Sequence, residues 1–503
     1  IVAKETDKSA AILSKVMAKS DDITVASVIN NITEKNANEE SKLSLKVMAD
    51  FSEKNPEKLE TLAQNNSDQI EKLTISAVEE AASSQEDADL IAKVVASASD
   101  DLVNKVVEEV SKNSTEKNQT LSAHVLKAIV DSESGKIDII NNDVKDIMIK
   151  QTIQSAQNQA GGTGVQQTQD MTSIVSDIIV NTNTETGSKM IEEVNNSSTE
   201  NNLSLQVISG ISEKDTTKLN TLSENNKEQM DTLAESAIKN ALASQGDADL
   251  IAQVVANANE DFANQIIGEV TKNSTDENQA LSAKVMKSIV ETNPDKIENL
   301  NDENKDNLIS QTIEAAKNQA EGTSSDELDL SNTIAEIVTN SDTGTAAKVL
   351  ESLEEASNDS DSKLSLSVVS NLTKQENYEE KMEILSVTSS VVDQSINTLI
   401  EKAVENASSE EDLELVTDIV ENSKGSLGDK IVNSANKSEE SKKKITEIIV
   451  KVVEKNPEKA VEIIDKNKNT NTVIEVVKTK IEKGEAITTD DFEDVFKKNV
   501  SPN

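Results

Sequence analysis

The sequence predicts an all-α, tandem helical-repeat solenoid or rod of about six units, with roughly four helices in each. Three observations predict this fold. The chain repeats itself when the numbering is shifted by 160, since residues 83–126 and 243–286 are identical at 26 of 44 positions. Its apolar residues recur at the spacing of an α-helix and not at the spacing of a strand. Three of its four prolines fall at one phase of the repeat, where they mark helix starts. Such internal duplication, called the long repeat below, is typical of arrays of one supersecondary unit.

A shorter period lies within the long repeat. An aliphatic helix start, such as Leu90-Ile91-Ala92-Lys93-Val94-Val95, recurs at residues 12, 90, 174, 250, 333 and 415. A second marker, Leu-Ser-x-x-Val, recurs between these starts. We therefore predict units at 1–82, 83–166, 167–242, 243–325 and 326–407, and a diverged sixth unit with a C-terminal cap at 408–503. Neighbouring units pair into modules, each as long as the long repeat.

The second unit shows how four helices are assigned. The first is predicted at Ala88–Ser97 and the second at Asp100–Lys112, each with aliphatic residues on one face. Ser99 is the expected N-cap of the second helix, with acids in its first turn. The third helix carries Leu121, and the fourth ends near Ala160. No stretch alternates apolar and polar residues long enough to predict a sheet.

Three of the four prolines occupy one motif. An Asn N-cap, a Pro at the first helical position, an acid and then a Lys predict a helix start. The motif occurs as Asn55-Pro56-Glu57-Lys58, Asn293-Pro294-Asp295-Lys296 and Asn456-Pro457-Glu458-Lys459.

Two polar connections and one aromatic segment interrupt the pattern. The loops at 161–170 and 321–326 are copies of each other, and we expect surface loops there, the alternative being contacts between subunits. Phe492 and Phe496 lie close together near the C-terminus. We expect them to cap the last exposed face of the array, with a docking peptide as the alternative.

Composition restricts the partners of the chain. It has 93 acidic residues and a formal net charge of -43, and all of its strongly basic residues are Lys. Nucleic acid and anionic membranes are poor partners for such a surface, while basic proteins and divalent cations remain candidates. Cysteine is absent, and no apolar run is long enough to span a bilayer. Because the chain starts at Ile1, we expect a processed chain or a fragment of a longer one.

We find no catalytic or cofactor-binding residues. His124 is the only histidine, and Lys284 stands at its position in the copy, so we expect both side chains on an exposed face. With no Cys and one His, the sequence lacks the residues of the common nucleophile–base pairs, and no phosphate-binding glycine motif occurs. The chain is therefore not expected to be an enzyme.

The metal prediction is confined to weak Ca²⁺ binding. Paired acids recur at one place in the unit, as Asp87 with Asp89 and Asp247 with Asp249. They are candidate Ca²⁺ ligands, although no stretch has the spacing of an EF-hand loop. The simpler interpretation is an acidic helix start that interacts with the helix dipole.

Two functional hypotheses follow. The main one is a structural, self-assembling subunit of an extracellular filament, sheath or surface layer of a microbe, which forms a homo-oligomer or polymer. The alternative is a monomeric acidic α-solenoid that binds a partner protein or ligand along one face. The expected location is extracellular or at the cell surface, with a cytoplasmic scaffold as the alternative. The arrangement is similar to α-solenoids such as HEAT-like arrays, but it lacks their signature residues. Low hydropathy also allows partial disorder, against which the regular helical periodicity argues.

Overall fold

The computed structural model describes most of residues 2–422 and a few positions after them. Within that range the described residues exclude short stretches at 36–41, 83, 115–117, 119, 161–169, 198–201, 242–243, 275–279, 321–328, 359–362, 389–393, 396–397, 401, 403–406 and 408. Beyond residue 422 they comprise residues 448, 451–452 and 455–456. Throughout these residues the regular structure is helical, and none of it is a strand.

The chain divides into two compact units. The first comprises Ile1–Ala241 with Asn257–Gln265, and the second comprises Leu242–Ala256 with Ile266–Asn503. Each unit is described by itself below.

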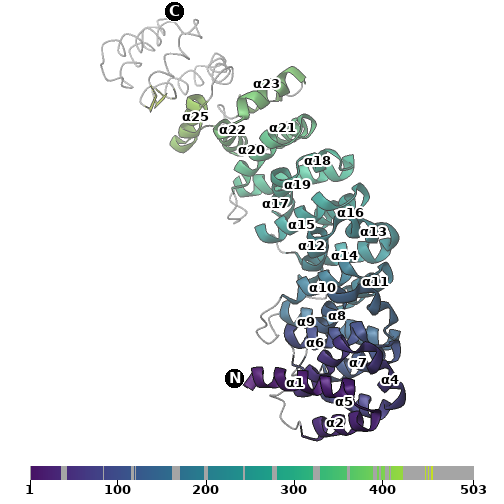
Figure 1. The fold of residues 1–503 in the computed structure, drawn as a ribbon. Helices are drawn as coiled ribbons and strands as arrows, with labels where there is room; N and C mark the ends of the chain where they lie inside the picture. The colour runs from purple at the N-terminus through teal and green to yellow at the C-terminus, as the bar shows by residue number, and fades with distance from the viewer. Residues whose placement is uncertain are drawn as a thin grey trace, which may run out of the picture. The chain divides into compact units, whose positions relative to one another are not determined.

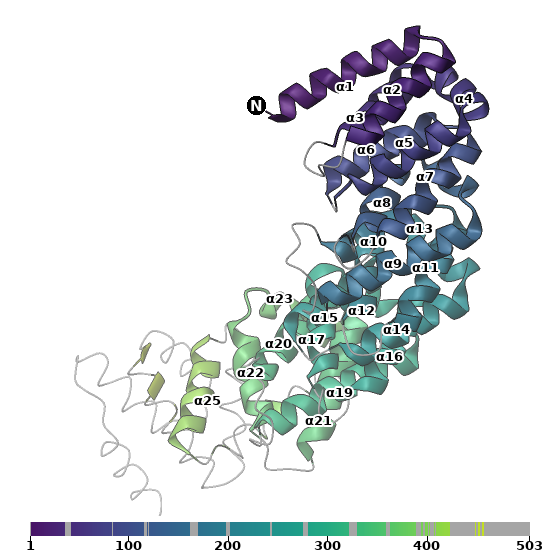
Figure 2. The same ribbon diagram turned by 90° about the horizontal axis from the view of Figure 1, so that it is seen from below.

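In the first unit, helices alternate between two layers (Figure 1). Each helix of the first layer packs on the next helix of that layer, as α3, α6 and α8 do in Figure 2. The first layer contains α1 (Val2–Lys19), α3 (Leu43–Lys54), α6 (Gln85–Ser97), α8 (Leu121–Glu133), α10 (Met171–Asn181) and α12 (Leu203–Lys214). The second layer contains α2 (Asp22–Lys35), α5 (Ser67–Glu79), α7 (Asp100–Asn113), α9 (Asn142–Ala160), α11 (Thr184–Ser197) and α14 (Lys227–Asn240).

The second unit repeats this arrangement. Its first layer contains α15 (Gln245–Asn257), α17 (Leu281–Thr292), α20 (Leu330–Asn340), α22 (Leu364–Lys374) and α25 (Glu410–Asn422). The opposite layer contains α19 (Asp302–Ala320), α21 (Thr343–Asn358) and α23 (Tyr378–Thr388). Helix α16 (Glu260–Asn273) precedes α17 in the chain. The structural step is thus a pair of helices, one in each layer, and two such pairs make up one predicted unit.

The prediction of an all-α helical-repeat solenoid is confirmed. The observed helices of the second predicted unit, α6 to α9, agree with the four expected there, except that α6 begins at Gln85, ahead of the predicted Ala88. Ser84 explains the earlier start, because its hydroxyl accepts a hydrogen bond from the Asp87 backbone N–H. The boundaries of the six units remain a prediction.

The proline motif starts a short connecting helix. This helix is additional to the four helices that we predict for each unit. Helix α4 (Pro56–Asn65) begins at Pro56, and the Asn55 side chain makes no capping hydrogen bond. At the other positions of this phase the connection is η1 (Ser134–Ile139), α13 (Thr216–Asn225) or α18 (Asp295–Glu298). Pro fixes a helical φ angle without needing a capping side chain, so the predicted start is correct although Asn55 does not cap it. Pro457 lies outside the described residues.

The core of each layer interface is aliphatic, and a polar network is copied within it. Ser122 donates to Gln151 Oε1 at 2.6 Å and shares a hydrogen bond of 2.7 Å with Ser114. Gln151 Nε2 then donates to the backbone oxygen of Ser111 at 2.8 Å. The same bonds recur one long repeat later among Thr271, Ser274, Ser282 and Gln311. The duplication therefore preserves hydrogen bonds between helices, most of them partly buried, as well as apolar contacts.

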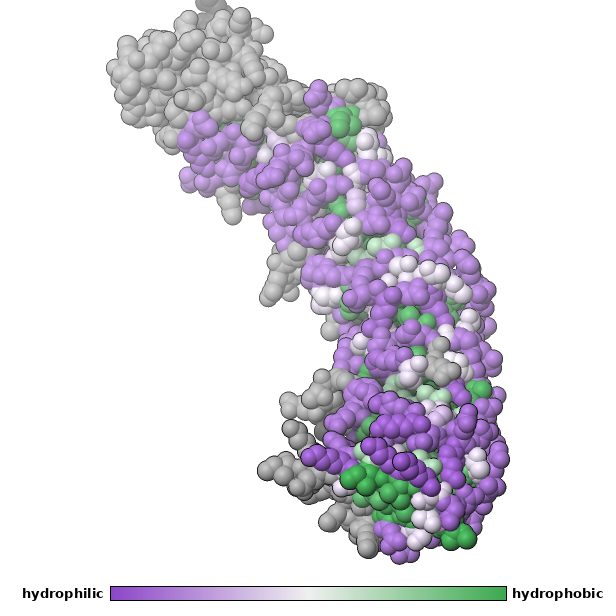
Figure 3. Space-filling view, in the orientation of Figure 1, coloured by the Kyte–Doolittle hydropathy of each residue, from purple (hydrophilic) through white to green (hydrophobic). Residues whose placement is uncertain are grey.

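Large apolar side chains are exposed at only a few described positions. Figure 3 shows mostly hydrophilic residues, with apolar side chains gathered where α1 and α2 lie. There Ile12, Val16 and Ile23 are 61%, 40% and 83% exposed. None of the described helices combines the length and the apolar character that crossing a bilayer requires. The predicted loop at 161–170, except for Asp170, lies outside the described residues, and so do the predicted loop at 321–326 and the predicted Phe492–Phe496 cap.

Candidate partner-binding surface

Negative charge is concentrated on one layer of the first unit. The second-layer helices, with the connecting helices α4 and α13, carry 20 Asp and Glu residues and 11 Lys residues. The six helices of the first layer carry 11 acids and 9 Lys. The excess of acids is therefore nine on the second layer and two on the first.

The second unit has the same bias in most of its helices. Helices α18, α19, α21 and α23 carry 12 acids and 5 Lys, whereas α15, α17, α20 and α22 carry 4 acids and 3 Lys. Helix α25 is the exception in the first layer, because it carries six acids and no Lys.

Ion pairs join successive helices of the second layer without removing its charge. Lys105 lies 3.4 Å from Glu71, Lys189 lies 3.1 Å from Asp146, and Lys348 lies 2.6 Å from Asp306. All of these side chains are at least one-third exposed, and exposed pairs stabilise a fold by less than about 1 kcal/mol. The layer keeps its excess of carboxylates, which attract cationic groups from solution.

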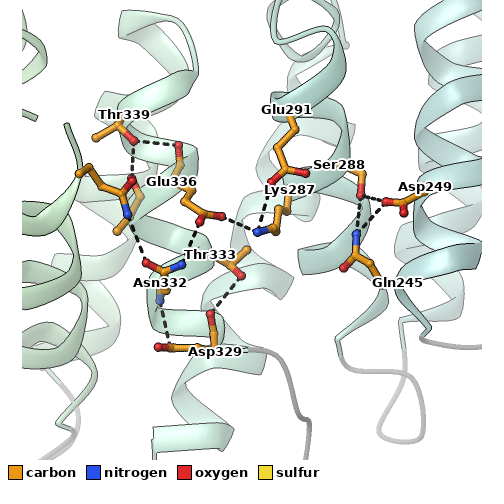
Figure 4. A network of polar contacts seen from close by, with 12 residues as sticks. Gln245, Asp249, Lys287, Ser288, Glu291, Asp329, Asn332, Thr333, Glu336 and Thr339 are labelled. Carbon is orange, nitrogen blue, oxygen red and sulfur yellow. Dashed lines mark hydrogen bonds and ion pairs between the residues drawn. The ribbon is translucent and has the colours of Figure 1, made fainter. Parts of the chain in front are cut away.

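The first layer is instead cross-linked by a continuous run of polar contacts (Figure 4). Lys287 on α17 contacts Glu291 at 3.2 Å and donates to Glu336 on α20 at 2.6 Å. Asn332 Nδ2 donates to Glu336 at 2.9 Å, and Gln375, the C-cap residue of α22, donates to Asn332 at 3.2 Å. These contacts join three successive helices of the layer.

The first unit repeats the central part of this run. Lys127 on α8 lies 2.6 Å from Asp131 and 3.6 Å from Asp177 on α10, and Lys214 on α12 lies 2.8 Å from Asp177. Burial lowers the pKa of Lys127, but its hydrogen bonds and the charges of the two aspartates outweigh burial, so the net pKa is raised. Charge on this layer is thus largely neutralised by neighbouring helices.

The predicted Ca²⁺ ligands have other partners in the structure. The Asp87 side chain is 1% exposed, and it accepts from Lys42 Nζ at 2.5 Å and from the Ala82 backbone N–H at 2.9 Å. Asp89 is exposed and accepts from Gln85 at 2.7 Å. Residues two apart on a helix do not face each other, so Asp87 and Asp89 do not converge.

The second pair of candidates has a similar arrangement. Asp247 is 8% exposed, and its backbone N–H donates to Ser244 Oγ at 3.1 Å. Asp249 accepts from Gln245 at 2.7 Å and from Ser288 at 2.6 Å. Among the described residues, no three His, Cys, Asp or Glu side chains gather as metal ligands would.

The expected exposure of His124 and Lys284 is wrong. Their exposed fractions are 5% and 7%. Both residues lie on a first-layer helix that has neighbours on either side, α6 and α10 in the case of His124, and these neighbours cover the position. Burial lowers the pKa of His124; the charge of Asp89 opposes this effect and that of Lys127 adds to it. The replacement of His124 by Lys284 in the copy suggested exposure because both residues are polar. The side chains are nevertheless buried, because neighbouring helices pack over them.

Sequence reasoning also missed a recurring half-buried lysine. Lys136 donates to the backbone oxygen of Ala98 at 3.3 Å, and Lys218 and Lys381 donate to those of Thr182 and Ser341. These oxygens lie at the ends of first-layer helices, where carbonyls lack helical partners. Burial lowers the pKa of Lys218 and of Lys381. The fourth residue of the Asn-Pro-acid-Lys motif is the signal that could have identified this position.

Comparisons with known proteins bear on the fold. No protein-family model matches the chain, and no curated protein matches it in sequence. Among solved structures it is similar to the karyopherin Kap121p bound to Ste12p, with 10% identity and a TM-score of 0.34 over 98% of this chain and 54% of that one. This chain thus spans about half the length of that karyopherin chain.

Two further structures have the same kind of fold. Human Puf-A in complex with DNA matches with 11% identity and a TM-score of 0.29, covering 91% of this chain and 99% of that one. A circular tandem repeat protein with a novel repeat topology matches with 14% identity and a TM-score of 0.24, covering 99% and 98%. At these identities the likeness concerns the fold alone.

The comparisons correct the main functional hypothesis. The similar solenoids include a karyopherin bound to Ste12p and Puf-A bound to DNA, and neither is described as a filament, sheath or surface-layer subunit. The prediction of an extracellular filament subunit is therefore wrong, and so is the extracellular or cell-surface location. The expectations of self-assembly and of no nucleic-acid partner gain no support.

Proposed function

We propose that this chain is a monomeric acidic α-solenoid that binds a basic partner protein, and that it does so without a catalytic site or cofactor. The observation that carries this proposal is the unequal distribution of charge between the layers. In the first unit the second layer has an excess of nine acids, while the first layer has an excess of two.

The physical basis is electrostatic complementarity. A surface with one sign of charge steers an oppositely charged protein to it and repels partners of the same sign. A nucleic acid would be repelled by the same carboxylates, so we propose a protein with exposed Lys or Arg. Neutralisation within the first layer leaves the second layer as the side that attracts such a partner.

The test compares charge removal on the two layers. The immobilised chain is incubated with lysate of its source cells, and the partner is identified and quantified. One variant combines E108Q, E192Q, E228Q and E235Q, which lie on α7, α11 and α14 of the second layer. The control combines E53Q, E86Q, D89N and E213Q on first-layer helices and removes the same charge.

We expect wild type to retain one basic protein in a constant ratio, and to lose it when salt is raised above physiological ionic strength. The second-layer variant should retain at least about fivefold less, and the control should stay within about twofold of wild type. Equal loss in both variants, or the absence of a basic partner, would contradict the proposal.

A further inference from the structure

A hollow of about 760 Å³ lies in the second layer of the first unit, between α4, α5 and the start of α7. Its lining includes Ile70 and Leu102, each 2% exposed, so it has an apolar component. Glu60, Asp100 and Asp101 also line it and are exposed. The hollow thus combines buried aliphatic side chains with three exposed carboxylates.

The electrostatics of the hollow favour a cation. Lys105 is the one basic residue in the lining, and it is paired with Glu71 at 3.4 Å. The N-terminus of α7 contributes roughly half a positive charge, which offsets only part of the three carboxylates. A long basic side chain fits this combination, because its aliphatic stem contacts apolar surface while its charged head reaches carboxylates.

The internal copy has hydrogen bonds at this place that the first module does not share. At the corresponding place one long repeat later, the Asn259 backbone N–H donates to Asn220 Oδ1 at 2.7 Å. Asn259 Nδ2 also donates to Ser223 Oγ at 3.1 Å. These bonds tie the start of α16 to α13.

The residues that make those bonds are replaced in the first module. Glu60, Ala63 and Ser99 stand where the copy has Asn220, Ser223 and Asn259. Ala63 has no hydroxyl to accept a bond, and Ser99 has no amide to donate one. The two copies therefore differ by the side chains that line the hollow, while Asp101 and Asp261 are the same.

We propose that this hollow binds an arginine or lysine side chain of the partner protein. This inference rests on the proposed function and adds to it a location and an anchoring group. The carboxylates suit the guanidinium fork of Arg better than the ammonium of Lys, because two carboxylate oxygens accept two parallel N–H donors.

The test uses a fluorescein-labelled peptide, Gly-Ser-Arg-Leu-Arg-Ser-Gly, and its fluorescence anisotropy with the full chain at low salt. Versions with Lys or norleucine in place of both Arg residues distinguish the two cations and remove the charge. One chain variant combines E60N, A63S and S99N, which installs the residues of the copy. A second variant, D100N/D101N, keeps the shape of the hollow and removes two charges. The matched control E260Q/D261N removes the same charge at the corresponding place in the copy.

We expect the Arg peptide to bind more tightly than the Lys peptide, and the norleucine peptide to bind at least about tenfold more weakly. Both hollow variants should weaken binding of the Arg peptide at least about tenfold, while the control stays within about twofold of wild type. Circular dichroism should show that all variants keep wild-type helix content.

Two outcomes would overturn the inference. Equal weakening by D100N/D101N and E260Q/D261N would assign binding to the general acidity of the layer. Failure of wild type to bind the Arg peptide would exclude the hollow as a site for a basic side chain. Neither outcome removes the proposed function, whose own failure appears in the pull-down as the absence of a basic partner.

Discussion

At the scale of single residues, buried and half-buried charged groups contact partners that lie about one helix pair earlier in the sequence. Asp87 meets Lys42, 45 residues before it, and Lys218 meets the backbone oxygen of Thr182, 36 residues before it. Lys42 adopts a left-handed backbone conformation (φ 49°), which is unfavourable for a side chain of this size. Each of these charged groups therefore meets its partner only when successive helix pairs stack on each other.

Asp87 and Asp89 offer a matched pair for mutation. We expect D87N to destabilise the first unit by about 2 kcal/mol, because it leaves Lys42 without its carboxylate in a partly buried site. D89N should change stability by less than about 0.5 kcal/mol, because Asp89 is exposed. Urea unfolding followed by circular dichroism measures both. Similar losses in the two variants would show that the pairing with Lys42 does not stabilise the fold.

The burial of His124, the one histidine of the sequence, predicts that stability depends on pH near neutrality. Because burial lowers its pKa below the ordinary value of about 6.5, the unfolded chain takes up a proton before the folded chain does. Stability should therefore fall as the pH falls through about 6.5 towards the folded pKa. Thermal unfolding between about pH 8 and pH 5 should show this fall in wild type and a smaller one in H124Q. An unchanged slope in H124Q would assign the effect to the carboxylates.

At the scale of helices, close approach within a layer depends on one glycine. A Cβ at Gly210 on α12 would lie 2.9 Å from the Cβ of Ser176 on α10 and still nearer its hydroxyl oxygen. That hydroxyl donates to the backbone oxygens of Thr172 and Val207 at 3.0 and 3.2 Å. The two helices can keep this separation only without a side chain at residue 210.

We expect G210A to destabilise the first unit by about 2 kcal/mol, although Ala favours an isolated helix. Gly246 on α15 is the control, because a Cβ there would meet no atom within 4 Å. G246A should leave stability unchanged or raise it by up to about 1 kcal/mol. Denaturant unfolding measures both variants. Stabilisation by G210A would mean that α10 and α12 are farther apart than described.

Much of the helical pattern could be predicted from the sequence, because capping residues and aliphatic spacing act locally. The start of α7 after Ser99 and the start of α8 near Leu121 are examples. The burial of His124 could not be predicted, since it depends on which helices cover α8. The acidic bias of one layer was missed for a related reason: it emerges only when alternate helices are assigned to layers. The hollow is lined by scattered residues of three helices and of the turn before α7, and it has no signature motif.

At the scale of the whole chain, comparing the two copies of the long repeat shows which side chains are preserved and which differ. Aliphatic core positions and the Ser–Ser–Gln network recur in the second copy of the long repeat. Around the hollow, by contrast, Asn220, Ser223 and Asn259 of the copy are replaced by Glu60, Ala63 and Ser99, while the acids at 100 and 101 are kept as Glu260 and Asp261. A chain that copies its scaffold and varies the side chains around a recess can present different contacts at different places along a repetitive structure.

The central claim is that the chain stays monomeric and binds basic protein segments. Sedimentation velocity tests it most directly, with the chain at micromolar concentration and the labelled Arg peptide followed by its fluorescein absorbance. We predict a single species of 54.2 kDa, with the peptide sedimenting in the same boundary at low salt and remaining behind at high salt. Growth of the chain into polymers, or a peptide that never sediments with it, would contradict the claim.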